Sequence, residues 1–104
     1  MTEEDPMAFL RSRYERHERL PIPRFVAAVQ AAGCTASPSR MRGVNFEVNY
    51  GGMCVGTITV ENDVPVLEMS KRETPSSILT SVASNVHRIR QQNAVQMGHG
   101  MGMR

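Results

Sequence analysis

The 104-residue chain has little of what usually anchors a small domain: no tryptophan, three phenylalanines, two tyrosines and two cysteines. So few aromatic side chains predict a core of aliphatic residues and methionine. No apolar run approaches the roughly 20 residues that a membrane-spanning helix needs. The chain begins with acidic Glu3, Glu4 and Asp5 instead of a basic stretch followed by an apolar one, so no signal peptide is predicted. We therefore expect a cytoplasmic protein with no membrane partner.

Motifs that carry catalysis are also absent from the sequence. It contains no glycine-rich phosphate loop, no His-Glu-x-x-His and no Cys-x-x-Cys. Cys34 or Cys54 could pair with His87 as nucleophile and base, but two free thiols in a reducing compartment and a surface histidine are the simpler interpretation. We predict a protein that is not an enzyme, with no cofactor and no evident small-molecule substrate.

The segment 44–69 has the clearest structural pattern, beginning with an alternation of apolar and polar residues that is typical of a strand with one buried face. Gly51-Gly52 and Asn62-Asp63 interrupt it at hairpin spacing, which predicts three antiparallel strands. The second loop should pair Val60 with Pro65. Because proline cannot donate a hydrogen bond to a neighbouring strand, the third strand is expected at an edge of the sheet.

Two registers compete for the first hairpin. A two-residue loop over 51–52 sets Val48 opposite Val55, whereas a three-residue loop over 50–52 sets Val48 opposite Cys54. The second version gathers the apolar residues on one face, and because register follows burial we predict that version. The residues expected to point inward are Phe46, Val48, Cys54, Ile58 and Leu67.

Helical spacing of apolar residues predicts three helices, over 2–19, 23–32 and 75–92. Gly33 is expected to end the second helix, and from residue 93 the Gln, Gly, Met and His composition predicts disorder. The expected fold class is α+β: a three-stranded antiparallel meander with one face covered by helices, in the order α-α-β-β-β-α. We expect one domain over 1–92 and a disordered tail over 93–104.

The outer face of the predicted meander is the first candidate for a binding surface. It would be more apolar than a solvent-facing surface requires, which is typical of an interface, and its free edges could accept a partner strand. The alternative is that Val and Thr are simply good strand formers. The residues expected on this face are Val55, Thr57, Thr59, Val64 and Val66. We therefore predict a small binding, adaptor or inhibitor-type protein that contacts a protein partner or a second copy of itself.

A nucleic-acid-binding regulator is the alternative function. Eleven arginines and one lysine make up the basic residues, and most of the arginines fall between positions 11 and 42. Arginine suits phosphate contacts, although a solvated helix face interleaved with Glu15 and Glu18 would have the same pattern. The candidate residues are Arg11, Arg13, Arg16, Arg19, Arg40 and Arg42.

Soft metal ligands alternate with glycine at the end of the chain. Thioether sulfur and imidazole suit Cu(I), but chain ends without a function have the same composition. We expect no bound metal, and the four residues of the alternative are Met97, His99, Met101 and Met103.

Overall fold

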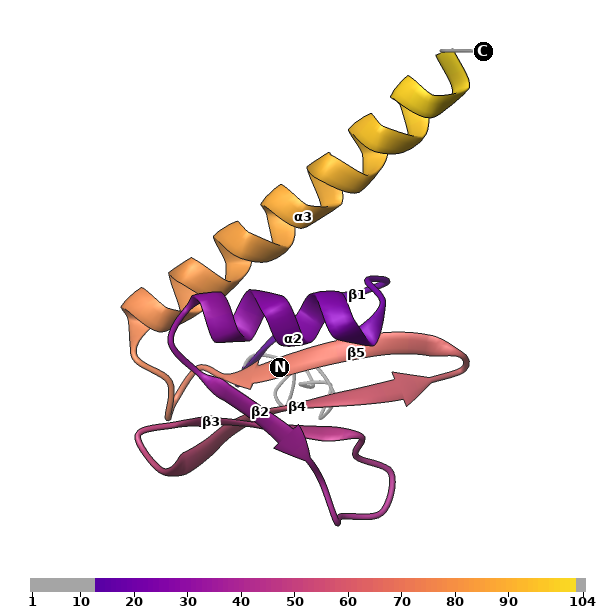
Figure 1. Cartoon of the computed structure of the whole chain (residues 1–104). Coiled ribbons are helices and arrows are strands. Elements are labelled where there is room, and N and C mark those ends of the chain that lie inside the picture. Colours follow the sequence, from indigo (N-terminus) through magenta and orange to yellow (C-terminus); the bar gives the residue numbers. More distant parts are fainter. Residues whose placement is uncertain (1–12, 103–104) are drawn as a thin grey trace, which may run out of the picture.

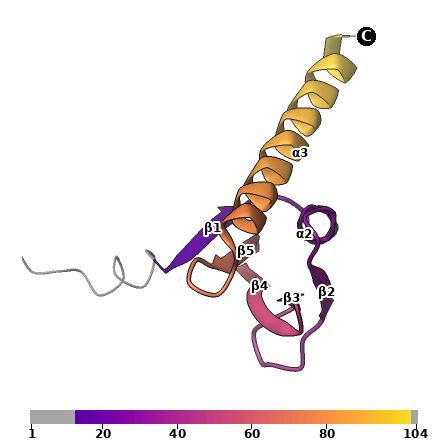
Figure 2. The same cartoon turned by 90° about the vertical axis from the view of Figure 1, so that its left-hand side faces the viewer.

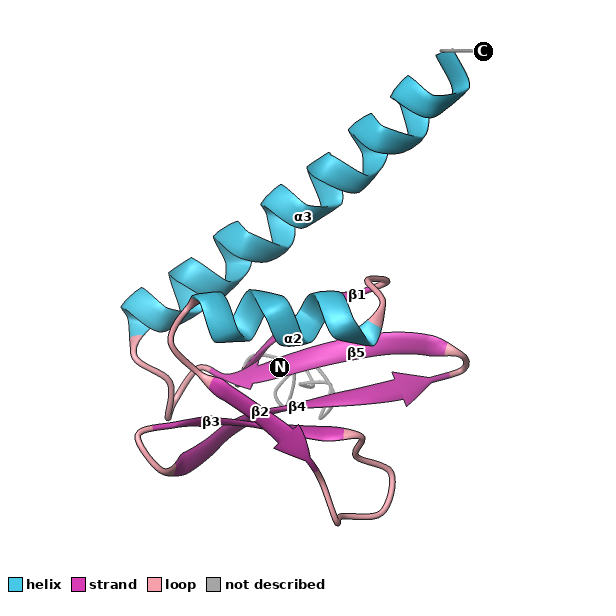
Figure 3. Ribbon diagram, in the orientation of Figure 1, coloured by secondary structure: helices cyan, strands magenta, loops and turns pink. Residues whose placement is uncertain are grey.

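The computed structural model describes the backbone of residues 13–102 and the side chains of residues 13–92. Its elements are β1 (Tyr14–Glu18), α2 (Ile22–Ala31), β2 (Thr35–Pro38), β3 (Phe46–Tyr50), β4 (Met53–Glu61), β5 (Val64–Ser70) and α3 (Ser76–Gly102). The strands form one antiparallel sheet in the order β1-β5-β4-β3-β2. Both helices lie on the same face of this sheet (Figures 1 and 3). The α+β class is confirmed, but the sheet has five strands instead of three and the order of elements differs from the predicted one.

Residues 14–18 form a strand, so the predicted helix over 2–19 is wrong for this part; residues 2–12 lie outside the described chain. β1 pairs with β5, with His17 opposite Leu67 and Arg16 opposite Glu68. The alternation puts Glu15 and His17 on the helix-covered side and Arg16 on the other side, because successive side chains of a strand point to opposite faces.

The segment 34–43, between the predicted second helix and the predicted first strand, contains the other unexpected strand. β2 pairs with β3, with Ala36 opposite Val48. It is short and ends at Pro38, as is common for a strand at a sheet edge.

The β4–β5 hairpin agrees with its prediction. Val60 lies opposite Pro65, and the loop residues Asn62 and Asp63 both have positive φ, as a two-residue type I′ loop requires. The predicted edge position of β5 is wrong, since β1 lies beside it. Pro65 faces Arg19, whose N–H donates to the Pro65 carbonyl at 3.1 Å. Because Arg19 lies beyond the last residue of β1, the missing N–H of Pro65 costs no hydrogen bond within the β1–β5 ladder.

The β3–β4 hairpin corrects the predicted register. Tyr50 lies opposite Met53, which leaves the two-residue loop over 51–52, and both of its glycines have positive φ. A bulge then shifts the pairing, so that Val48 lies opposite Gly56. The apolar residues still share one face, but a bulge and not a longer loop puts them there.

Val55 is the extra residue of this bulge, and the burial of Val55 and Cys54 is the reverse of the prediction. Val55 is 2% exposed and packs in the core cluster, while Cys54, expected inside, is exposed. The next residue, Gly56, has no room for a side chain. A Cβ there would lie 2.6 Å from the Glu68 carbonyl oxygen and 2.8 Å from Met69 Sδ. β4 therefore passes unusually close to β5 at this point.

The core lies between the two helices and the sheet. Its fully buried large side chains on this side are Phe25, Val29, Val48, Ile58, Leu67, Met69, Val82 and Val86. α2 ends as predicted: the N–H groups of Gly33 and Cys34 bond to the carbonyls of Gln30 and Val29, each at 3.0 Å. Asn85 of α3 then donates from Nδ2 to the Ala28 carbonyl at 2.9 Å, and so joins the two helices.

The helix α3 begins after Pro75, whose carbonyl accepts the N–H groups of Ile78 and Leu79 at 3.0 Å each. Its backbone continues to Gly102, past the predicted helix end near Gln92. Its C-terminal half extends away from the sheet (Figure 2). The described helices include none that is both long and apolar enough to cross a membrane. The division into one domain and a disordered tail stays a prediction.

Candidate functional site

The face of the sheet opposite α2 and α3 is covered by no described helix, and we call it the open face (Figure 1). The strand registers place these side chains on it: Tyr14, Arg16, Glu18, Glu47, Thr57, Thr59, Glu61, Val64, Val66, Glu68 and Ser70. Carboxylates and hydroxyls outnumber apolar groups in this set. The open face is therefore more polar than the predicted outer face.

The predicted interface residues lie in three different settings. Val55 is in the core, so its expected exposure is wrong. Val66 is on the open face but only 1% exposed. Thr57, Thr59 and Val64 are partly buried on that face. Two of the five side chains therefore cannot offer exposed apolar surface, and the role of the face as an interface stays a prediction.

Val66 is covered by an ion-pair cluster that crosses three strands. From β1, Arg16 donates through Nε to Glu18 Oε2 at 2.7 Å, through Nη1 to Glu68 Oε2 at 2.9 Å and through Nη2 to Glu61 Oε1 at 2.7 Å. We call these four residues the Arg16 cluster. Because Glu61 is on β4, the Arg16 side chain has to cross β5 close to Val66.

The cluster has a clear electrostatic signature. Hydrogen bonding to Glu61 and then to Glu18 raises the pKa of Arg16 above its ordinary value. The Arg16 hydrogen bond likewise holds the pKa of the Glu18 carboxyl below its usual range. Exposed ion pairs contribute little individually, but these three share one guanidinium and join β1, β5 and β4. Each of the three Arg16 side-chain nitrogens therefore donates to a carboxylate.

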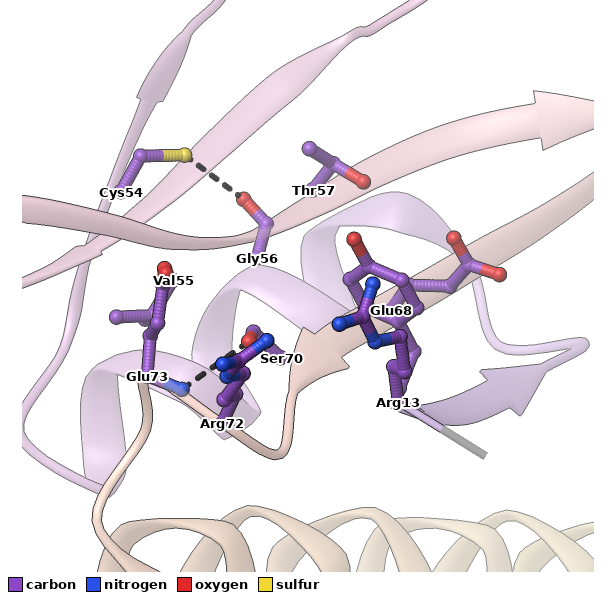
Figure 4. Close-up of a pocket in the computed structure, with 10 residues that line it drawn as sticks. Arg13, Cys54, Val55, Gly56, Thr57, Glu68, Ser70, Arg72 and Glu73 are labelled. Carbon is purple, nitrogen blue, oxygen red and sulfur yellow. Dashed lines mark hydrogen bonds between the residues drawn. The ribbon is translucent and has the colours of Figure 1, made fainter. Parts of the chain in front are cut away.

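The other end of the open face, where β5 finishes, is hollowed. A cavity of about 280 Å³ lies there. The polar residues that line it include Arg13, Tyr14, Thr57, Glu68, Ser70, Arg72 and Glu73. Figure 4 shows the labelled members of this set around the space. Val55 and Gly56 also line the hollow, and Val55 is itself buried in the core.

Backbone contacts hold the two basic segments of this hollow together. The Lys71 N–H donates to the Arg13 carbonyl at 2.8 Å, so the start of β1 lies against the connection from β5 to α3. The Glu73 N–H donates to Ser70 Oγ at 3.1 Å and bends that connection back. At the rim, the Cys54 thiol donates to the Gly56 carbonyl at 3.5 Å. Arg13 and Arg72, 59 positions apart in the sequence, therefore line one cavity.

The arginines predicted to bind nucleic acid are not gathered into one patch. Arg13 lines the hollow, Arg16 is in its cluster, and Arg19 follows β1; Arg11 lies outside the described residues. The last two, Arg40 and Arg42, are exposed in the loop after β2, at the opposite edge of the sheet from β1. Four strand spacings separate those edges, or about 19 Å. A role in nucleic-acid binding stays a prediction.

Sequence reasoning missed the pocket residues Tyr14, Ser70 and Arg72. The pair Lys71-Arg72, directly after a predicted strand and ahead of a helix start, was the one available signal. The predicted thiols are both free, with Cys34 buried and Cys54 exposed, and burial raises the pKa of Cys34.

The predicted tail ligands cannot be placed as a site. Met97, His99 and Met101 belong to the C-terminal part of α3, where side chains are not described, and Met103 is outside the described residues. In the described part of the chain, no three His, Cys, Asp or Glu side chains come together in a way that could hold a metal.

A second titratable group lies on the helix-covered side of β1. His17 Nε2 is 3.5 Å from Glu15 Oε1, and both atoms are buried without a hydrogen-bond partner. Beside them, Arg90 of α3 donates to the Glu18 carbonyl. Burial lowers the pKa of His17, because it disfavours the charged imidazolium.

Set against known proteins, the chain matches no protein-family model, no curated protein and no solved structure.

Proposed function

We propose that this chain is a small, non-enzymatic binding protein that holds a protein partner on its open face. The observation that carries the proposal is the hollow at one end of a sheet face that no described helix covers. Its volume of about 280 Å³ is just below the roughly 300–1,000 Å³ typical of small-molecule sites. It therefore suits one side chain of a larger partner better than a whole cofactor.

The arrangement of reactive groups supports a binding role over a catalytic one. Cys54 is at the rim of the hollow, Cys34 is in the core, and His87 is exposed on α3 in the helix layer. The pairing of a thiol with His87 therefore has no support. Nucleic acid is a less suitable partner for this face, since Glu18, Glu61 and Glu68 would repel phosphates at its centre.

The proposal can be tested by crosslinking from the open face. Cys54 is exposed and Cys34 is buried, so a thiol-reactive photo-crosslinker attaches selectively to Cys54 in the folded protein. Irradiation in an extract of the native host should join it to one host protein. That protein, identified by mass spectrometry and purified, should then bind the unlabelled full chain.

The matched control moves the same crosslinker to the helix layer, by combining Cys54→Ser with Ser84→Cys; Ser84 is exposed on α3. The partner should be captured from Cys54 and not from position 84. Equal capture from both positions, capture of a second copy of the chain alone, or failure of the purified partner to bind would each contradict the proposal.

A further inference from the structure

We propose that the hollow at the end of the open face binds the carboxylate of an aspartate or glutamate side chain in an acidic segment of the protein partner. The inference rests on the proposed function, because it assumes that a protein docks on this face. It adds the chemistry that would recognise that protein, and it names Arg72 and Ser70 as the groups that bind it.

Arg72 provides the positive charge. Its side chain is exposed at the hollow. Within residues 13–92 it forms no side-chain hydrogen bond or ion pair. An exposed guanidinium can bind a carboxylate through two parallel N–H donors, which is the strongest side-chain pairing of this type. Lys71 and Arg13 lie beside it and add positive charge at the same end of the sheet.

The hydroxyl of Ser70 adds a hydrogen-bond donor. Because Ser70 Oγ accepts the Glu73 N–H at 3.1 Å, its own hydrogen is left to point elsewhere. Ser70 lines the hollow together with the hydroxyls of Thr57 and Tyr14, and Figure 4 shows it next to Arg72. A carboxylate placed here would find a guanidinium and hydroxyl donors in the same hollow.

The acidic residues of the hollow select the kind of anion. Glu68 and Glu73 line it as well as Arg13 and Arg72, and Glu68 is paired to Arg16 at 2.9 Å. These two carboxylates would repel an anion that enters the hollow, and a dianionic phosphate would meet the larger repulsion. A carboxylate has a single negative charge and loses less to that repulsion.

The test uses the partner identified by crosslinking and the full chain. Arg72→Glu reverses the charge at the hollow and should weaken partner binding about tenfold or more, which corresponds to the loss of a charge-assisted hydrogen bond. The matched control is Arg24→Glu, the same charge change at an exposed position of α2, which should weaken binding less than about twofold. Both variants should melt like the wild type, since both side chains are exposed.

A third variant separates the two proposals. Thr59→Arg places a bulky charge on the open face outside the hollow and should block docking of any protein there. If Thr59→Arg abolishes binding while Arg72→Glu behaves like Arg24→Glu, the face is the docking surface but the carboxylate site is overturned. If Thr59→Arg has no effect, the proposed function itself is overturned.

The nature of the anion is tested with short peptides. A blocked Gly-Glu-Gly peptide and its counterpart with phosphoserine in place of glutamate are each titrated into the protein, and the amide resonances of Ser70 and Thr57 are followed by NMR. The glutamate peptide should shift these resonances, and Arg72→Glu should remove the shift. A tighter response to the phosphoserine peptide, or no response to the glutamate peptide at millimolar concentration, would overturn the assignment to a carboxylate.

Discussion

The two faces of the sheet are stabilised in different ways. On the helix-covered face Phe25, Ile58 and Leu67 are 0% exposed, and removal of apolar surface from water supplies the stability. On the open face Arg16 holds three glutamates, and Val66 is covered by side chains that are themselves partly exposed. The helices cover the first face, and no helix of the described residues covers the second.

The largest expected effect comes from the helix-covered face. Phe25→Ala should lower the free energy of unfolding by about 3–5 kcal/mol, because the cavity left by a buried aromatic ring is only partly refilled. Thr57→Ala on the open face is the control and should cost less than about 1 kcal/mol. Denaturant unfolding measures both. Similar losses for the two variants would contradict the contrast between the faces.

A smaller effect is expected at the Arg16 cluster. Arg16→Ala removes the shared partner of three glutamates and uncovers Val66, and should cost about 1 kcal/mol, since its ion pairs are partly exposed. Added salt should reduce the difference from the wild type. Arg16→Met separates the two contributions, because it keeps an apolar cover without the charge. If Arg16→Met matches the wild type in low salt, the ion pairs contribute nothing.

The smallest effect is a pH dependence on the helix-covered side of β1. Since the pKa of His17 is lowered from its ordinary value of 6.5 by burial, the unfolded chain takes up a proton at a higher pH than the folded one. Stability is therefore full above about pH 6.5 and falls as the pH drops from there towards the folded pKa. Glu15 would attract the protonated ring and Arg90 would repel it, so the two partly offset each other.

Thermal melting between pH 7.5 and 5.5 measures this dependence. His17→Gln should flatten the fall in melting temperature over that range, whereas His87→Gln, at an exposed helix position, should leave it unchanged. An identical fall in the wild type and His17→Gln would show that another group is responsible. The depressed pKa of Glu18 acts below this window, because carboxylates titrate at lower pH.

Elements defined by neighbouring residues could be predicted. The helix over 23–32 was correct to within one residue, because Gly33 provides the left-handed conformation that ends it. The second hairpin was correct because Asn62 and Asp63 tolerate positive φ and alternation sets their flanking pairs. Both signals lie within a few residues of the structure that they specify.

Elements defined by distant partners could not be predicted. The sequence of residues 14–18 is as compatible with a charged helix as with a strand. Pairing with β5 favours the strand, and the partners are distant in the chain: Arg16 and Glu68 are 52 positions apart. The bulge at Val55 is decided in the same way, since it brings Gly56 opposite Val48 and against the backbone of β5. Neither feature has a local sequence signal that excludes the alternative.

The candidate site likewise has parts that the sequence predicted and parts that depend on distant partners. Thr57 was correctly expected on the face away from the helices, and Arg13 was noted for its charge. That Arg13 and Arg72 share a hollow follows only from the pairing of β1 with β5, which sets the Arg13 carbonyl against the Lys71 N–H.

By itself, the sequence determined the α+β class, the position of the strand-rich segment and the turn at Asn62-Asp63, because alternation and turn residues act over a few residues. The tertiary structure alone decided that the sheet has five strands, that its uncovered face is polar and ion-paired, and that a hollow lies at one end of it. Those properties depend on which distant segments compete for the free edges of the central strands, and burial and hydrogen bonding settle that competition only when the whole chain is folded.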